Sequence, residues 1–342
     1  MAGRRGGRVN ARDVARAAGV SQSAVSRTFT PGASVAAETR QRVISAAREL
    51  GYRPNAFARS LITRRSRMIG LVLADLYNPF YAGMLEAVSR ELQAAGHHVM
   101  VFFTDRGEAD DALQEILQYP VAGLLMASAT LSSALARECA EAGIPVVLLN
   151  RDVPDAPTVS VTADNEAGGA AVGDFLARAG HQRVAFIAGD PEASTSRDRE
   201  CGFRDALARH GLACHGRAVG NYTREGAREA ARILFRTDAP PDAVFVANDY
   251  MAFAVMDTLR GELGLRVPED VSVVGYDDVA QAAWDAYDLT TVTQPAEAMV
   301  STAVAALLGS IHDGTPGRDR RVIAGELVVR GSSRRPKNAP RD

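Results

Sequence analysis

Lysine is almost absent from this sequence of 342 residues, and the only one is Lys337, near the C-terminus. A body without lysine cannot form a Schiff base or build the lysine-containing loop that binds nucleotide phosphates. The six histidines form no HExxH pair, and neither a GxSxG elbow nor a GxGxxG turn follows a predicted strand. The sequence therefore offers no recognisable catalytic centre, and we predict neither a bound metal nor a cofactor.

Cysteine and long apolar runs are also scarce. The three cysteines, Cys139, Cys201 and Cys214, are odd in number and lack metal-ligand spacing, which is typical of unpaired thiols in a reducing compartment. No apolar run approaches the roughly 20 residues of a membrane span, and the arginine-rich start lacks the apolar core of a signal peptide. We expect a cytoplasmic protein without a membrane partner.

Positive charge is concentrated at the N-terminus. Residues 1–67 hold 14 arginines against Asp13, Glu38 and Glu49, a net charge of about +11, whereas the remaining residues carry about −13. A basic block neutralises DNA phosphates and releases counterions, and an acidic body is discouraged from lying on the duplex. Because apolar residues recur periodically here, a disordered basic tail is the weaker interpretation, and the pattern predicts a DNA-binding head.

Residues 10–53 have the pattern of a helix-turn-helix. Asn10 can cap a helix over 11–18, Gly19 makes the turn, and Ser21 can cap a second helix. A plain helical hairpin would also explain a glycine turn between two helices.

The start of the second helix carries the candidate DNA-reading side chains. Gln22 and Ser23 are its first exposed residues, and a recognition helix reads bases from its N-terminal end. Glutamine pairs with adenine through two hydrogen bonds, and serine adapts to several acceptors. Ser26 and Arg27 lie one turn further on and suit phosphate or guanine.

A short segment follows the head. Pro54 can occupy the first turn of a helix over 55–62, and so short a helix is marginal in water without a surface to fold against. Leu61 lies among arginines and would be exposed if the segment stood alone. This pattern fits an apolar wedge that enters the minor groove when the segment folds on DNA, and a simple linker helix is the alternative.

From residue 68 onward, short apolar runs alternate with helical stretches. The runs are MIGLVLA, HVMVFF, GLLMA, PVVLL, RVAFIAG, AVFVAN and VSVVGY, and the alternation indicates parallel βαβ units. Gly96, Gly143, Gly180 and Gly211 fall where helices should end, and "AAGHHVMVFF" is echoed by "RAGHQRVAFI", which suggests two similar halves. Two open parallel sheets that face a crevice hold a ligand at the carboxyl ends of their strands.

Polar and aromatic residues follow these predicted strands, at the positions where a ligand would bind. They are Phe80, Tyr81, Asn150, Arg151, Thr195 to Arg199, Tyr222, Asn248, Asp249, Asp277 and Asp278. A sugar requires carboxylate and amide acceptors, a forked arginine donor and a flat apolar surface, and this set has all three.

Each of these residues also has a purely structural interpretation. Asn248, Asp249, Asp277 and Asp278 could cap helices, with Asp249 and Asp278 the stronger cap candidates. Arg199 could belong to a solvated helix face together with Arg197 and Arg204. Phe80 and Tyr81 could be core residues, and for Trp284, the only tryptophan, packing is favoured over a rim contact.

The segments "DVARAAGVSQSAVSRTF", "ETRQRVISAARELGYRPNAFARSL" and "IGLVLADLYNPFY" resemble the lactose and galactose repressor family of bacterial transcription regulators. The resemblance implies that Gln22, Ser23 and Arg27 read bases, that Leu61 intercalates, and that the phosphate contacts come from Ser21, Ser26, Thr39, Tyr52 and Asn55. Thr30 stands where the family usually has Asn, and Ala36 where it usually has a capping Ser, so phosphate contacts at those two positions are not expected.

The resemblance extends over the body, which is similar to a periplasmic sugar-binding protein. In "RECGF", "VANDYMA" and "VVGYDD" it implies effector contacts by Arg199, Asn248 and Asp277. Tyr222 matches an aromatic platform and Gln294 of "TVTQP" another effector-binding position.

We therefore predict an α/β protein with an N-terminal all-α helix-turn-helix head and a two-lobed, periplasmic-binding-protein-like body of parallel βαβ units. The predicted divisions are the head at 1–53, a hinge helix and linker at 54–67, the body at 68–335 and a tail at 336–342. Lobe one is expected at about 68–162 and 292–324, and lobe two at about 163–291 and 325–335.

The predicted function is that of a DNA-binding transcription regulator, usually a repressor in this family, which binds a palindromic operator as a homodimer under the control of a sugar-like effector. It would be associated with the bacterial nucleoid when bound to its operator. A solute-binding protein would share the body but should carry an export signal instead of a basic head. An α/β enzyme with a fused head would need a nucleophile or phosphate loop that the sequence does not show.

Overall fold

In a computed structural model, the chain divides into two compact units, residues 1–66 and 67–342. The structure describes residues 9–30, 32–53, 66–73, 75–104, 114–127, 133–153, 156, 158–314 and 318–336. Of the expected hinge segment only Ser66 and Arg67 are described, so the predictions for Asn55 and Leu61 lie outside the described residues.

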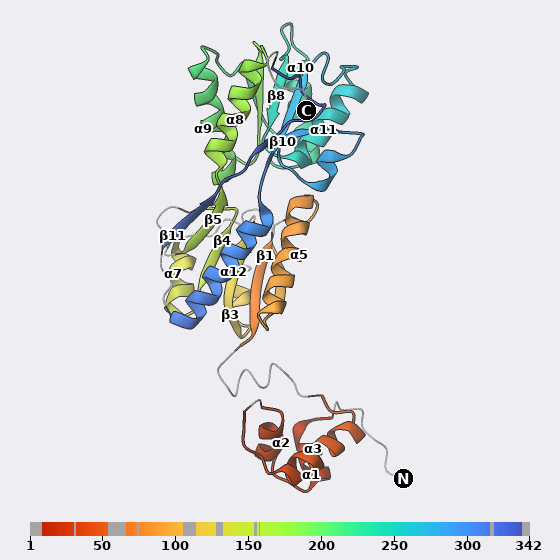
Figure 1. Cartoon of the computed structure of the whole chain (residues 1–342), viewed down its shortest axis with the longest axis vertical. Coiled ribbons are helices and arrows are strands. Elements are labelled where there is room, and N and C mark those ends of the chain that lie inside the picture. Colours follow the sequence, from red (N-terminus) through yellow and green to blue (C-terminus); the bar gives the residue numbers. More distant parts are fainter. Residues whose placement is uncertain are drawn as a thin grey trace. The chain divides into compact units, whose positions relative to one another are not determined.

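The described residues of the first unit form three helices, α1 (Ala11–Ala18), α2 (Gln22–Thr28) and α3 (Ala37–Glu49) (Figure 1). The predicted caps are present. The side-chain oxygen of Asn10 accepts hydrogen bonds from the first turn of α1, and the carboxylate of Asp13 accepts one from the backbone N–H of Asn10. Gly19 ends α1 with a φ of 62°, and the hydroxyl of Ser21 accepts from the backbone N–H of Ala24 at 3.2 Å.

A small apolar core joins the three helices. Val14, Val25 and Val43 contribute one fully buried side chain each, and smaller alanines fill the space between them. The start of α3 is weaker than those of α1 and α2, because its N-cap residue, Ala36, makes no side-chain hydrogen bond to the helix.

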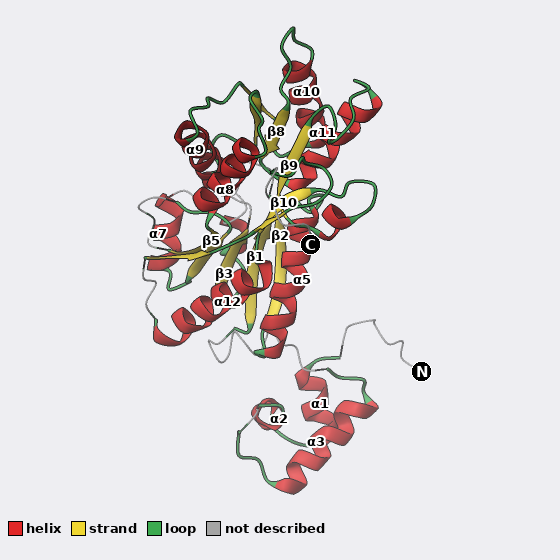
Figure 2. Ribbon diagram, turned by 45° about the horizontal axis from the view of Figure 1, so that its top comes forward, coloured by secondary structure: helices red, strands yellow, loops and turns green. Residues whose placement is uncertain are grey.

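The described residues of the second unit form two six-stranded sheets, drawn with their helices in Figures 1 and 2. The first has the order β11-β5-β4-β3-β1-β2, and its strands are β1 (Met68–Leu73), β2 (His98–Phe103), β3 (Val121–Ala127), β4 (Val146–Leu149), β5 (Val159–Ala163) and β11 (Asp319–Ile323). The second has the order β12-β10-β9-β8-β6-β7, and its strands are β6 (Val184–Ala188), β7 (Gly216–Val219), β8 (Ala243–Val246), β9 (Ser272–Asp277), β10 (Thr290–Thr293) and β12 (Leu327–Val328). Neighbouring strands are parallel throughout, except that β12 is antiparallel to β10.

Helices cover both sheets. The first sheet carries α5 (Pro79–Ala94), α7 (Ser133–Glu141) and α12 (Ala296–Asp313). The second carries α8 (Asn165–Arg178), α9 (Ser194–Arg209), α10 (Arg224–Phe235) and α11 (Asp249–Gly261), and a short 3-10 turn, η1 (Ala280–Ala283), follows β9. In β1, Leu71 and Leu73 pack in the same cluster as α5 and α12, whereas Val72 packs with Cys139 of α7, because successive strand side chains point to opposite faces.

The chain crosses between the sheets after β5, after β10 and after β11. Because β10 is hydrogen-bonded to β9 up to Thr293, the chain leaves the second sheet after Thr293. The two sheets have the same order of strands, so the two halves are alike in structure. The echo that suggested this was misleading in detail, since it pairs β2 with β6, which occupy different positions in the two sheets.

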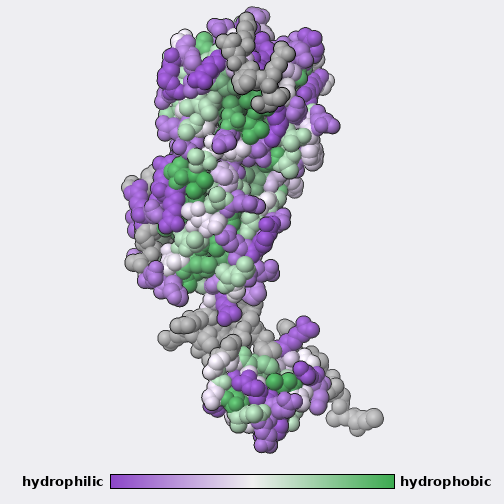
Figure 3. Space-filling model, viewed as in Figure 1, coloured by the Kyte–Doolittle hydropathy of each residue, from purple (hydrophilic) through white to green (hydrophobic). Residues whose placement is uncertain are grey.

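Within the described residues, no helix is long and apolar enough to cross a membrane. On the face drawn in Figure 3, hydrophilic side chains are interspersed with smaller apolar patches over both units.

Candidate functional site

Residues from both sheets meet where the strands end. We call them the interlobe cluster, and they follow seven different strands: Tyr81 after β1, Asn150 and Arg151 after β4, Thr195 and Arg199 after β6, Tyr222 after β7, Asn248 after β8, Asp277 at the end of β9 and Gln294 after β10. Phe80 lies beside Tyr81 at the start of α5.

Arg199 is the most buried cation of the cluster, with an exposed fraction of 2%. Its Nε donates to Oδ1 of Asn165 at 2.8 Å, and its Nη1 lies 3.6 Å from Oδ1 of Asp277. Its guanidinium also lies 3.6 Å from the ring centroid of Tyr276. The alternative of a solvated helix face is therefore wrong for Arg199, although it holds for Arg197 and Arg204, which are exposed on the same helix.

Asp277 and Gln294 form a buried pair. The amide Nε2 of Gln294 donates to Oδ1 of Asp277 at 2.5 Å, while its Oε1 is buried without a hydrogen-bond partner in the described residues. Because an ionised carboxylate only accepts, the nitrogen must face Asp277 and the oxygen must remain free for a donor. Burial raises the pKa of Asp277 to about 6, although Arg199 and hydrogen bonds from Gln294 and Asn78 oppose the rise.

The alternative that these residues cap a helix holds for Asn248 and is wrong for Asp249. Asn248 is the N-cap of α11, and its Oδ1 accepts from the backbone N–H of Met251 at 3.0 Å. Asp249 is instead fully buried and accepts from the hydroxyl of Thr291 at 2.6 Å and the backbone N–H of Val279 at 3.0 Å. Burial, with the nearby charge of Asp277, raises the pKa of Asp249 to about 8.

The structural interpretations of Asp278 and Trp284 also need correction. Asp278 does not cap η1, whose N-cap is Val279, and its carboxylate instead accepts from Arg330 at 2.7 Å. Trp284 is 56% exposed, so packing does not account for its position at the end of η1.

The first lobe contributes the side-chain amide of Asn150 and the guanidinium of Arg151 to the interlobe cluster. Asn150 has a φ of 59°, and its Nδ2 lies 3.3 Å from the hydroxyl of Tyr81, while its Oδ1 is buried without a partner in the described part of the chain. Nη1 of Arg151 donates to the hydroxyl of Thr195 at 3.1 Å, which joins the two lobes. The structure thus connects Tyr81 to this network, and the ring of Phe80 lies 5.3 Å from that of Tyr81, with both residues in the same apolar core cluster.

Tyr222 lies on the second-lobe side, with its hydroxyl 3.2 Å from that of Thr195. A Cβ on Gly189 would lie 2.1 Å from Cζ of Tyr222, so the ring lies directly against the backbone of Gly189. Only glycine leaves room for the ring at this position.

Two contributing residues were not singled out from the sequence. Asn78 caps α5, and its side chain also makes a hydrogen bond to Asp277 of the other lobe. Asn165 accepts a hydrogen bond from Arg199. The pattern "YNPFY" predicts a helix cap at Asn78, but nothing local indicates a partner almost 200 residues further along the chain.

In the first unit, the DNA-site candidates of α2 are all on the surface. The exposed residues are Ser21, Gln22, Ser23, Ser26 and Arg27, whereas Thr39 and Tyr52 are half-buried. The hydroxyls of Ser21 and Ser23 lie 2.8 Å apart, so the cap of α2 also positions a predicted base-reading side chain.

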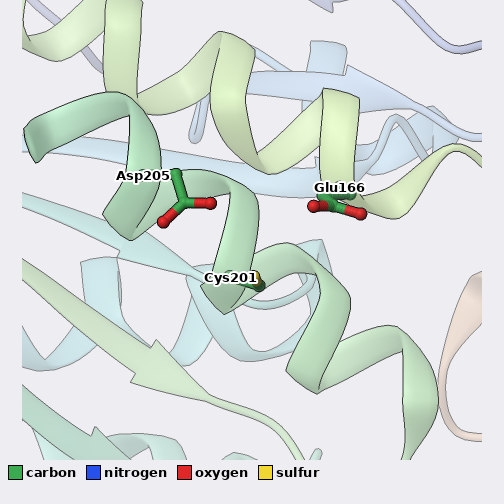
Figure 4. A group of neighbouring side chains, drawn as sticks. All are labelled: Glu166, Cys201 and Asp205. Atoms are coloured by element: carbon green, nitrogen blue, oxygen red, sulfur yellow. The ribbon is translucent and has the colours of Figure 1, made fainter. Parts of the chain in front are cut away.

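Glu166 of α8 and Cys201 and Asp205 of α9 form an exposed group whose possible ligand atoms lie within 4.8 Å of one another (Figure 4). Burial and the neighbouring carboxylates, Asp205 foremost, raise the pKa of the Cys201 thiol. Because a metal binds the thiolate, this raised pKa disfavours ligation, and exposed acidic groups of this kind are common without a metal.

A helix-turn-helix head attached to a two-sheet body with a buried polar cluster defines a DNA-binding regulator with a ligand-binding body. The family described as bacterial regulatory proteins, lacI family, matches residues 10–55, and the periplasmic binding protein-like domain matches residues 174–333. The chain is 32% identical over 329 residues to the HTH-type transcriptional repressor PurR of Photobacterium profundum, covering 94% of this chain and 97% of that protein.

Two solved structures are also similar. The lac repressor dimer bound to operator and the anti-inducer ONPF has a TM-score of 0.84 at 29% identity, covering 95% of this chain and 99% of that one. The complex of the transcriptional regulator CelR with cellobiose has a TM-score of 0.71 at 33% identity, covering 95% and 100%. The chain belongs to the lacI family of bacterial regulatory proteins and is a DNA-binding transcriptional regulator.

Proposed function

We propose that this chain is a repressor that binds a palindromic operator as a homodimer and changes its affinity for DNA when a small metabolite binds the interlobe cluster. The observation that carries the effector site is that two amide oxygens of the interlobe cluster, Oδ1 of Asn150 and Oε1 of Gln294, are buried without a hydrogen-bond partner in the described residues. A buried polar atom without a partner costs about 1–3 kcal/mol, and a ligand that supplies the missing hydrogen bonds removes this cost.

The proposed effector site consists of Phe80, Tyr81, Asn150, Thr195, Arg199, Tyr222, Asn248, Asp277 and Gln294. Their acceptors and donors suit hydroxyl groups, and Tyr222 offers a flat surface for the C–H face of a sugar. CelR, which resembles this chain, is solved with the disaccharide cellobiose. The relatives are regulators, and we propose that this chain likewise performs no chemistry and acts in the cytoplasm.

The proposed DNA site consists of Gln22, Ser23 and Arg27 on base edges, with Ser21, Ser26, Thr39, Tyr52, Asn55 and Leu61 as supporting contacts. Ser21, Gln22 and Ser23 are exposed at the capped start of α2, which is the end that a recognition helix presents to the major groove, and Ser26 and Arg27 are exposed one turn further on. We propose the divisions 1–53 for the head, 54–67 for the hinge, 68–335 for the body and 336–342 for the tail.

We propose that two copies of the chain associate through the edge of the first sheet. Among the described strands β2 pairs only with β1, and its end carries Phe103 with an exposed fraction of 60%. An apolar edge strand is a site at which chains associate, and the similar lac repressor is solved as a dimer on its operator.

Selection of binding sites from randomised duplex DNA by the purified full-length chain tests the proposal. We expect an inverted repeat with half-sites about one helical turn apart, and binding that weakens steeply with salt. Gln22→Ala should relax preference at one base pair of each half-site by about 1–3 kcal/mol, whereas non-specific binding should be unchanged. Enrichment of a single asymmetric site, or of no site, would refute the proposal.

A further inference from the structure

Arg151 is a buried positive charge without an ionic partner among the residues that the structure describes. It is 7% exposed, and its Nη1 donates to the carbonyl oxygen of Asn150 at 2.7 Å and to the hydroxyl of Thr195 at 3.1 Å. These acceptors are neutral, and none of the ion pairs found among the described residues includes Arg151. Burying a charge without a counter-charge is unfavourable by several kcal/mol, so native proteins pair such charges or leave them for a ligand.

Two carboxylates that influence Arg151 electrostatically do not form an ion pair with it. Asp190 and Asp277 influence it only electrostatically, from beyond ion-pair distance. Asp190 already accepts from the backbone N–H of Glu192 at 2.9 Å, and Asp277 is engaged by Arg199 and Gln294. Within the described residues, Arg151 therefore remains an excess positive charge that no ion pair neutralises.

The start of helix α9 adds to this excess. The hydroxyl that Arg151 contacts belongs to Thr195, in the first turn of this 16-residue helix. The N-cap residue is Ala193, which makes no side-chain hydrogen bond, and the first turn has no acidic residue. A helix N-terminus left in this state carries a partial positive charge and free N–H groups, which favour an anion.

An unpartnered amide lies next to Arg151 in the chain. Asn150 is 3% exposed, and one atom of its side-chain amide has no partner in the described residues. The assignment of oxygen and nitrogen does not alter this, because the hydroxyl of Tyr81 can bond to either and the other atom then remains free. This buried amide is a second, independent sign that a ligand completes the site.

We propose that the effector carries an anionic group, a carboxylate or a phosphate, which binds between Arg151 and the first turn of α9. The rest of the ligand is polyhydroxylated and is held by Asp277 and Gln294, whose oxygens accept from hydroxyls. The effector is thus a sugar acid or a sugar phosphate, and not a neutral sugar. This inference rests on the proposed function, since it names the ligand class of the same cluster.

Calorimetric titration of the full-length chain with matched ligands tests the inference. The pairs are glucose with glucuronate, galactose with galacturonate, glucose with glucose 6-phosphate, and ribose with ribose 5-phosphate. We expect at least one acid to bind, and its neutral parent to bind at least about 30-fold more weakly, because a buried charged contact is lost. Binding of a uronate would identify the anionic group as a carboxylate, and binding of a sugar phosphate would identify it as a phosphate. Equal binding of the neutral parent, or binding by none of the acids, would overturn the inference.

Variants of Arg151 separate ligand binding from support of the fold. Arg151→Gln should weaken binding of the acid at least about 30-fold and abolish the preference over the neutral parent, and Arg151→Lys should restore part of it. The melting temperature of the ligand-free Arg151→Gln protein should not fall, because an unneutralised buried charge has been removed. The matched control is Arg266→Gln, which removes the same charge from an exposed pair with Asp270. This control should change neither the ligand preference nor the melting temperature.

A lower melting temperature of Arg151→Gln with unchanged ligand preference would show that Arg151 only joins the lobes, and the inference would fail. The proposed function has a separate test. If an acid binds with the expected preference but never changes operator affinity, the proposed regulation is wrong while the charge preference stands.

Discussion

Replacing Arg199 by Met should destabilise the second unit far more than an ordinary surface substitution. Methionine has a similar length, so the loss comes from electrostatics and hydrogen bonds and not from an empty volume. Asp277 would lose its only ion-pair partner among the described residues, and Asn165 would lose a donor at 2.8 Å. Removing one partner of a buried ion pair destabilises by about 3–5 kcal/mol, because the remaining charge stays buried.

The change is measured by thermal unfolding of the full-length chain. For a unit of this size, about 2–3 °C of melting temperature corresponds to 1 kcal/mol, so we expect a fall of roughly 6–15 °C. Trp284 is the only tryptophan and belongs to the second unit, so its fluorescence follows this unit separately from the head.

A double-mutant cycle shows whether the pair with Asp277 is the cause. Asp277→Asn keeps an acceptor for Gln294 and leaves Arg199 its contacts with Asn165 and Tyr276, so it should destabilise less. The double variant should be more stable than the sum of the single effects predicts, with a coupling of about 1–3 kcal/mol. Additive effects, or a loss below about 1 kcal/mol for Arg199→Met, would refute the reasoning. Because Arg199 supports the fold, Asp277→Asn is also the cleaner variant for testing the response to an effector.

Three further predictions concern stability. Since the pKa of Asp249 is raised to about 8, its contribution to stability should be complete below about pH 4 and be lost as the pH rises through 8. Asp249→Asn should flatten this decline in melts at several pH values, and an unchanged slope would contradict the assignment. Gly189→Ala places a Cβ 2.1 Å from Cζ of Tyr222 and should destabilise by about 1–3 kcal/mol. Tyr222→Ala should remove that penalty, and a penalty that persists would rule out the ring as its cause. Ala36→Ser supplies the missing cap of α3 and should protect the amides of that helix from hydrogen exchange by about 0.5–2 kcal/mol, whereas unchanged exchange would argue against capping.

Local chemistry was sufficient for the head. The helix predicted over 11–18 has those bounds in the structure, and both predicted caps form, because a cap involves residues only two or three positions apart. The long apolar runs likewise became strands of two parallel sheets, since a strand buried on both faces is apolar throughout.

Strands without an apolar run were not predicted. The strand β10 has the sequence TTVT, and β5 has VSVTA, so neither shows a continuous apolar pattern. Both are fully or almost fully buried because neighbouring strands and helices cover them. The hydroxyl of Thr291 in β10, for example, is satisfied by Asp249. Partners from distant parts of the chain made these polar strands possible, and no local pattern records such partners.

The roles of the arginines in α9 were likewise decided by packing. Arg197, Arg199 and Arg204 lie within eight residues of one helix. Neither their residue type nor their spacing shows which of them is buried. In the fold, Gly169 and Gly202 let α8 approach α9 so closely that a Cβ at either position would overlap backbone atoms. This approach brings Asn165 to Arg199, which becomes buried against Tyr276 and Asp277, while the other two arginines remain in water.

The sequence by itself determined the elements, their order and the chemical types available at the strand ends, because these follow from interactions over a few residues. Which side chains became buried partners was decided by the tertiary structure, because burial depends on contacts between residues far apart in the chain.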